Sequence, residues 1–206
     1  MPRRFIFAAS LALLTGGASQ LDAQAARVTP RPSFGVLAGL NIATLSGSDV
    51  EGASSRLGFI GGGYADFHFA GSGFGIEPEL LYSMQGAKTS GEEASLELSY
   101  LQIPVLFRYD FPTTSKARPF VVAGPSIGIK IGCNVSGQGV SVDCDTVNLQ
   151  TTGFDLGGTL GAGVGFKLGK QTASLGARYT IGTNDIFENN FKAKSRFWSI
   201  LAGFGF

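Results

Sequence analysis

The stretch ASLGARYTIG, residues 173–182, decides how this chain folds, because two kinds of residue alternate along it. Its odd positions carry Ala, Leu, Ala, Tyr and Ile, whereas its even positions carry Ser, Gly, Arg, Thr and Gly. Successive side chains of a β-strand point to opposite faces. The stretch therefore predicts a strand with one apolar face and one face of small and polar residues.

Seven other stretches show the same alternation, four of them less regularly. They lie at 33–44, 56–69, 74–84, 96–110, 119–132, 156–168 and 197–206. In 96–110 the alternation changes phase near Tyr100, which predicts a β-bulge or the point where the strand leaves a bilayer. Eight strands of this length suit a membrane barrel, whose tilted strands need roughly 9 to 11 residues to cross.

The connections between these strands alternate in length. Short links are expected at 71–73, 112–116 and 169–171, and longer polar links at 45–55, 85–95, 133–154 and 183–195. Short turns at one end and long loops at the other are typical of outer-membrane barrels, in which the short turns face the periplasm.

One face of the strands carries almost all of their charges. The charged residues on it are Asp66, Glu77, Glu79, Arg108, Lys130, Lys167 and Arg178. This face would line the lumen of a membrane barrel, but it would point to water in a soluble, lipocalin-like barrel. Glycine is abundant on the charged face of the last three strands, which favours a narrow lumen. We therefore predict an all-β fold, an eight-stranded antiparallel up-and-down transmembrane β-barrel over residues 33–206.

The chain ends on an apolar stretch, FWSILAGFGF, at residues 197–206. Trp198, Phe204 and Phe206 fall on the same face of the last strand, and we expect this face to contact outer-membrane lipid. A terminal Phe on a last strand resembles the signal that the outer-membrane insertion machinery recognises. These three residues are therefore our candidate insertion signal, and the machinery is an expected partner.

The N-terminal residues have the three parts of a secretory signal peptide. Arg3 and Arg4 precede an apolar run over 5–14, and small residues follow it up to Ala25. We expect residues 1–25 to be removed by cleavage near Ala25, leaving a short periplasmic segment, 26–32, before the barrel. Without Arg3, Arg4 and Asp22, the 16 basic and 15 acidic residues fall to 14 of each, so nothing favours a nucleic-acid partner.

Four segments resemble one family, the PorT-type outer-membrane β-barrel domains. They are FGVLAGLNIATL (34–45), GIEPELLYSMQGAK (75–88), YLQIPVLFRYDF (100–111) and RPFVVAGPSIGIKI (118–131). The resemblance implies an eight-stranded barrel in the outer membrane of a Gram-negative-type bacterium. The namesake is similar to a component that supports secretion, but most relatives have no assigned role, so an accessory role in protein secretion across the outer membrane stays a second alternative.

The charges of the lumen face are expected to pair with one another, because unpaired buried charges are costly. Such a network would plug an eight-stranded barrel, which is just wide enough to be filled by side chains. We therefore expect a structural or interaction role in the cell envelope, with a narrow channel for small solutes or ions as the alternative. No cofactor, metal site or enzyme activity is expected, because the outer loops offer no His and the single His68 has no obvious nucleophile beside it.

The two cysteines, Cys133 and Cys144, fall in the longest of the predicted loops. An exported chain meets an oxidising compartment, so we expect them to form a disulfide. The bond would protect the loop against proteases, or it would order a surface that binds a partner outside the cell. The sequence identifies no such partner.

Overall fold

The computed structural model describes residues 31–46, 53–89, 95–137, 140–147, 152–183 and 194–206. The predicted signal peptide, 1–25, and its cleavage near Ala25 lie outside these residues. The first strand begins at Arg31, within two residues of the predicted start of the barrel. No helix of the described part is long and apolar enough to cross a membrane.

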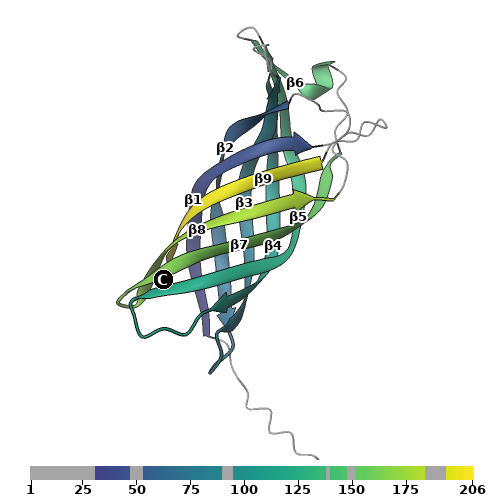
Figure 1. Ribbon diagram of the computed structural model, residues 1–206. Helices are drawn as coiled ribbons and strands as arrows, with labels where there is room; N and C mark the ends of the chain where they lie inside the picture. The colour runs from purple at the N-terminus through teal and green to yellow at the C-terminus, as the bar shows by residue number, and fades with distance from the viewer. Residues whose placement is uncertain (1–30, 47–52, 90–94, 138–139, 148–151, 184–193) are drawn as a thin grey trace, which may run out of the picture.

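Almost every described residue belongs to one antiparallel sheet (Figure 1). The elements are β1 (Arg31–Ser46), β2 (Ala53–His68), β3 (Phe74–Thr89), β4 (Ser95–Asp110), β5 (Ala117–Gly137), β6 (Val140–Asp143), the 3₁₀ helix η1 (Cys144–Val147), β7 (Phe154–Leu168), β8 (Gln171–Gly182) and β9 (Lys194–Gly205). Each long strand pairs with its sequence neighbours, and β9 pairs with β1 to close the sheet. Eight strands thus form a closed antiparallel barrel, as predicted, and β6 is a short ninth strand beside β5.

The two ends of the barrel differ, as the connection lengths predict. The turn end has the short links around Gly71, Ser115 and Gly169, and the C-terminus lies there too (Figure 1). The loop end carries β6, η1 and the longer connections. Gly71 and Gly169 adopt φ values of 76° and 72°, which suits glycine because the left-handed region is strained for other residues.

The alternation of the sequence becomes the inside and the outside of the barrel. Large apolar side chains point outward on all eight long strands; examples are Leu57, Leu80, Phe107, Leu160 and Ile200, each more than half exposed. Polar and charged side chains of the opposite parity are buried within the lumen. A soluble barrel would show the reverse arrangement, because water would face its outer surface.

The structure extends several strands beyond their predicted ends. β3 and β4 continue into the segment predicted as a loop at 85–95, and β5 continues to Gly137. The predicted loop at 133–154 therefore contains the end of β5, β6 and η1. The predicted irregularity near Tyr100 is a β-bulge, since the pairing of β4 with β5 shifts register between Ser99 and Tyr100.

Candidate functional site

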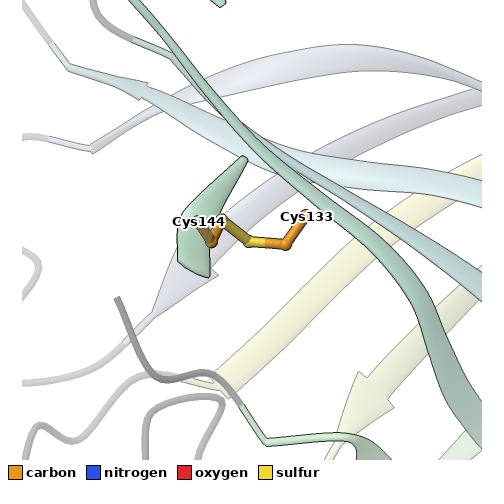
Figure 2. The surroundings of a disulfide bond; sticks show 2 residues. All are labelled: Cys133 and Cys144. Carbon is orange, nitrogen blue, oxygen red and sulfur yellow. A yellow bond between two sulfur atoms is a disulfide. The ribbon is translucent and has the colours of Figure 1, made fainter. Parts of the chain in front are cut away.

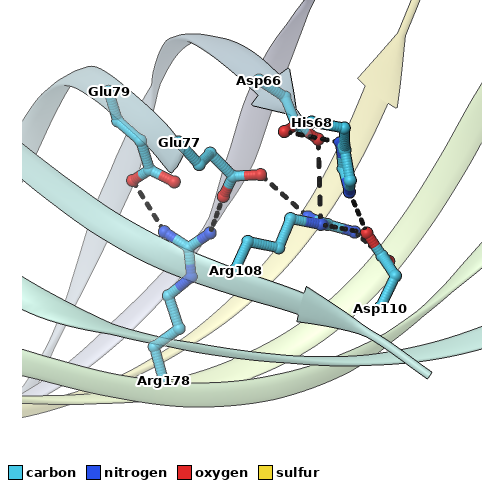
Figure 3. A network of polar contacts seen from close by, with 7 residues as sticks. All are labelled: Asp66, His68, Glu77, Glu79, Arg108, Asp110 and Arg178. Atoms are coloured by element: carbon cyan, nitrogen blue, oxygen red, sulfur yellow. Dashed lines mark hydrogen bonds and ion pairs between the residues drawn. The ribbon is translucent and has the colours of Figure 1, made fainter. Parts of the chain in front are cut away.

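The centre of the lumen holds an arginine between two carboxylates (Figure 3). Arg178 on β8 donates from Nη1 to Glu79 Oε2 at 2.7 Å and from Nη2 to Glu77 Oε1 at 3.1 Å. Both carboxylates come from β3, and all three side chains are buried. The interaction crosses the lumen, because β8 and β3 are not neighbours in the sheet.

A second arginine extends this cluster toward the turn end. Arg108 on β4 donates from Nη1 to Glu77 Oε2 at 2.8 Å, so Glu77 accepts from both guanidinium groups. Its Nε and Nη2 donate to the two oxygens of Asp110 at 3.1 Å each. The guanidinium also lies 3.9 Å from the centre of the Phe120 ring, a cation–π contact. Arg108 is thereby held in place on several sides.

His68 connects the ends of β2 and β4. Its Nδ1 lies 2.9 Å from Asp66 Oδ1, and its Nε2 contacts Asp110 Oδ2. The network therefore comprises seven residues: Asp66, His68, Glu77, Glu79, Arg108, Asp110 and Arg178 (Figure 3). The lumen charges predicted from the sequence include neither His68 nor Asp110. Their positions in the strands could have indicated both residues, because residues two apart in a strand point to the same face. His68 thus shares a face with Asp66, and Asp110 shares a face with Arg108.

Two of the predicted lumen charges do not join these ion pairs. Lys130 lies farther along β5, opposite Tyr100 near the loop end. Lys167 lies near the turn end of β7, on its lumen face, and is exposed. The structure thus brings five of the seven predicted charges together and places the other two apart.

Glycines on β7 make room for the network. An added Cβ at Gly161 would lie 2.6 Å from Arg178 Cγ and 2.8 Å from the carbonyl oxygen of Ala177. An added Cβ at Gly163 would lie 2.5 Å from Phe120 Cζ. These close approaches explain why small residues alternate with apolar ones along this strand.

Further polar contacts, most of them neutral, occupy the lumen between the network and the loop end. Asn41 donates from Nδ2 to Ser83 Oγ at 2.9 Å and accepts at Oδ1 from Ser199 Oγ at 2.7 Å. Thr159 and Thr180 share a hydrogen bond of 2.9 Å. Closer to the loop end, Ser195 donates to Gln85 Oε1 at 2.5 Å, and Arg56 pairs with Glu97. The contacts of Asn41 with Ser83, of Ser195 with Gln85 and of Arg56 with Glu97 join strands that are not neighbours in the sheet, whereas Thr159 and Thr180 are paired on adjacent strands.

The predicted disulfide is present at the loop end (Figure 2). Cys133 lies on β5 and Cys144 on η1, with Cα atoms 5.5 Å apart, and both are buried. β6 lies between them in sequence and pairs with the end of β5 from Asn134 to Gly137. We call residues 133–144 the loop-end hairpin.

The candidate insertion signal lies on the outer surface of β9 and at its end. Trp198, Phe204 and Phe206 are exposed, whereas Phe197 and Leu201 of the opposite parity are buried. Trp198 packs against Tyr179 on β8, with ring centroids 4.8 Å apart. The aromatic stretch at the end of the chain therefore presents an outward apolar face.

Comparison with known proteins agrees with this arrangement. The chain is similar in fold to Neisserial surface protein A (TM-score 0.52, 19% identity, 84% of this chain and 97% of that chain). Lower TM-scores of 0.48 relate it to OprG of Pseudomonas aeruginosa (16% identity, 85% and 95%) and to the outer-membrane enzyme PagL (15% identity, 82% and 97%). The chain matches no curated protein. At such identities the likeness shows the fold alone, and a fold does not decide between an enzyme and a non-enzyme.

The family itself is shown by sequence. The profile of the outer membrane protein beta-barrel domain matches residues 20–188, which is most of the chain. This match shows the general family, but it does not show the narrower PorT-type group that the sequence segments resemble. The lumen-facing charges, the outward apolar surface and the closed eight-stranded sheet are what such a barrel requires. This chain belongs to the outer membrane protein beta-barrel domain family.

Proposed function

We propose that this outer-membrane barrel is closed to solutes and serves a structural or interaction role in the cell envelope. The observation that carries the proposal is the pairing of Arg178 with Glu77 and Glu79 across the lumen. An arginine held by two carboxylates of β3, on the far side of a narrow barrel, fills the cross-section of the lumen. To open a path there, at least one buried ion pair must separate.

The energy of that separation favours the closed state. Removing one partner from a buried ion pair typically costs about 3–5 kcal/mol, because the other charge stays buried without compensation. Here Glu77 also accepts from Arg108, which in turn is fixed by Asp110 and Phe120. Movement of one side chain would therefore disturb several contacts at once.

A narrow channel for small ions is the competing function. The hydrogen bonds of Asn41, Ser83 and Ser199 continue the polar lumen from the network toward the loop end. Polar side chains along a lumen can conduct ions if they move apart. The two functions differ in one measurable property, the conductance of the folded barrel.

Planar-bilayer recording tests the proposal. We expect the wild-type barrel to be silent and Arg178→Ala, which removes the central guanidinium, to give small, steady openings. Lys116→Ala is the matched control, because Lys116 is exposed in a turn and does not line the lumen cavity. Steady ion-selective openings of the wild type that Glu79→Gln alters would contradict the closed barrel and support the channel.

We further propose a route by which the chain is exported and inserted into the outer membrane. A signal peptide that is removed near Ala25 would direct export of the chain. The outer-membrane insertion machinery would then recognise the outward-facing side chains of Trp198, Phe204 and Phe206. The barrel would then contact lipid with its apolar surface, and the loop-end hairpin, fixed by Cys133–Cys144, would face a partner outside the cell. Sequencing the N-terminus of the mature protein tests the cleavage, because a mature chain that retains residues 1–25 would contradict it.

A further inference from the structure

The turn end of the lumen opens into a cavity of ≈ 400 Å³. Its inner limit is formed by the network, through Glu77, Arg108 and Arg178, together with Leu37 and Leu201. Its mouth is formed by the turn residues 69–72 and by Phe206. This volume lies in the range of small-molecule sites, which is roughly 300–1,000 Å³.

The cavity carries an excess of positive charge. Five Lys or Arg side chains line it, against three carboxylates; these are Arg108, Arg118, Lys167, Lys170 and Arg178, and Asp66, Glu77 and Asp110. Glu79, which contacts Arg178 from the far side, raises the number of carboxylates to four. The side chains around the cavity therefore carry one positive charge in excess, before His68 and the main-chain carboxylate of Phe206 are counted.

The excess is concentrated on one wall. Each carboxylate of the opposite wall already contacts a basic side chain, because Asp66 and Asp110 contact His68 and Glu77 contacts both arginines. Within the described part of the chain, Arg118, Lys167 and Lys170 make no ion pair. Their charges face the cavity without a protein counter-charge from these residues.

Arg118 and Lys167 are placed to act together. Arg118 on β5 is opposite Gly165 on β7, and Lys167 lies two residues farther along β7 on the same face. Such diagonal neighbours lie roughly 7–8 Å apart, with their Cβ atoms somewhat closer, so two long side chains can reach one ligand. Gly165, which also lines the cavity, has no side chain to separate the two cations.

We propose that this cavity binds a small ligand through a phosphate group held by Arg118 and Lys167. A phosphate monoester carries about −1.5 to −2 charges at pH 7, which complements the excess of the wall. Arginine binds phosphate oxygens in a bidentate manner, and lysine adds a point charge. The turn end faces the periplasm and the inner leaflet, so the phosphate belongs to a soluble ester or to a phospholipid headgroup.

Isothermal titration of the purified full chain, folded in a phosphate-free detergent, tests the site. The probes are glycerol 3-phosphate for the soluble source and short-chain phosphatidylglycerol for the lipid source. We expect saturable binding that Arg118→Gln and Lys167→Gln each weaken at least tenfold. Lys116→Gln is the matched control, because Lys116 is a turn-end cation that does not line the cavity.

The results distinguish a soluble phosphate ester from a phospholipid headgroup, and they also show whether the proposed site exists at all. Binding of glycerol 3-phosphate indicates a soluble ester, and binding of the lipid alone indicates a headgroup. Absence of saturable binding to both probes, or equal weakening by Lys116→Gln, would overturn the site. A heat-dependent gel shift establishes that each variant is folded, and the exposed Lys167 remains informative if Arg118→Gln does not fold.

Discussion

Arg178 and Glu79 lie 99 residues apart in the sequence and meet in the middle of the lumen, with Nη1 2.7 Å from Oε2. The strands that carry them, β8 and β3, share no backbone hydrogen bonds. The contact therefore ties opposite walls of the barrel together, which the sheet pairing alone does not do. It fixes the width of the lumen at the height of the network.

Removal of the central arginine is expected to destabilise the barrel strongly. Arg178→Ala leaves Glu79 buried without its cation, and breaking such a buried pair costs about 3–5 kcal/mol. Glu79→Gln should cost clearly less, because an amide oxygen can still accept from Arg178. Urea titration of the folded barrel in lipid vesicles measures both unfolding free energies; equal values for the two variants would contradict the ion-pair account.

A single methyl group added inside the lumen is expected to destabilise the barrel. Gly161→Ala places a Cβ against Arg178 and the Ala177 carbonyl, and we expect a loss of about 1–3 kcal/mol of stability from overpacking. Gly158→Ala on the same strand is the control, because a Cβ there meets nothing within 4 Å. If both variants unfold at the same urea concentration, β7 does not pack against the network as described.

Charge on the outer surface should cost more at mid-strand than at the turn end. Leu160 and Leu168 are both outward and exposed on β7, but Leu160 lies mid-strand and Leu168 ends it. Leu160→Arg is expected to lose about 2–4 kcal/mol of stability in a bilayer, and Leu168→Arg about 0–1. The same urea titration in vesicles measures this depth dependence. A soluble barrel would tolerate both arginines equally.

The disulfide is expected to protect the loop-end hairpin without supporting the barrel. Its cysteines are 11 residues apart, and closing such a loop stabilises by about 3 kcal/mol in the chain-entropy model. In the double variant Cys133→Ser with Cys144→Ser, limited proteolysis within 133–144 should accelerate about tenfold or more. Ser136→Ala, which removes one exposed hydrogen bond to Ser141, should change little. Unaltered cleavage of the double variant would contradict this role.

The eight long strands could be predicted from sequence because each has two chemically different faces. The alternation predicted the strands, the short turns and an irregularity near Tyr100 without any long-range information. It underestimated strand lengths at the loop end, where polar residues such as Ser95 and Ser136 are equally common in loops. The short strand β6 follows from pairing with β5, which no local pattern indicates.

The site was predictable only in part for a related reason. Parity alone placed Asp66, Glu77, Glu79, Arg108 and Arg178 in the lumen. Which of them meet depends on the register and closure of the barrel, which bring His68 and Asp110 together from strands that are not neighbours. Asp110 immediately precedes a turn, where an acidic residue is ordinarily solvated. Its burial therefore could not be predicted without the three-dimensional structure.

The face of the strands that meets lipid decides whether the charged face lines the lumen, and the single Trp of the chain can report on it. Trp198 lies on the outward face of β9 and is 55% exposed. We predict that its fluorescence in lipid vesicles is strongly quenched by lipids with brominated acyl chains and hardly by aqueous acrylamide. Quenching by acrylamide without quenching by brominated lipids would place this face in water and would contradict the outer-membrane barrel with a charged lumen.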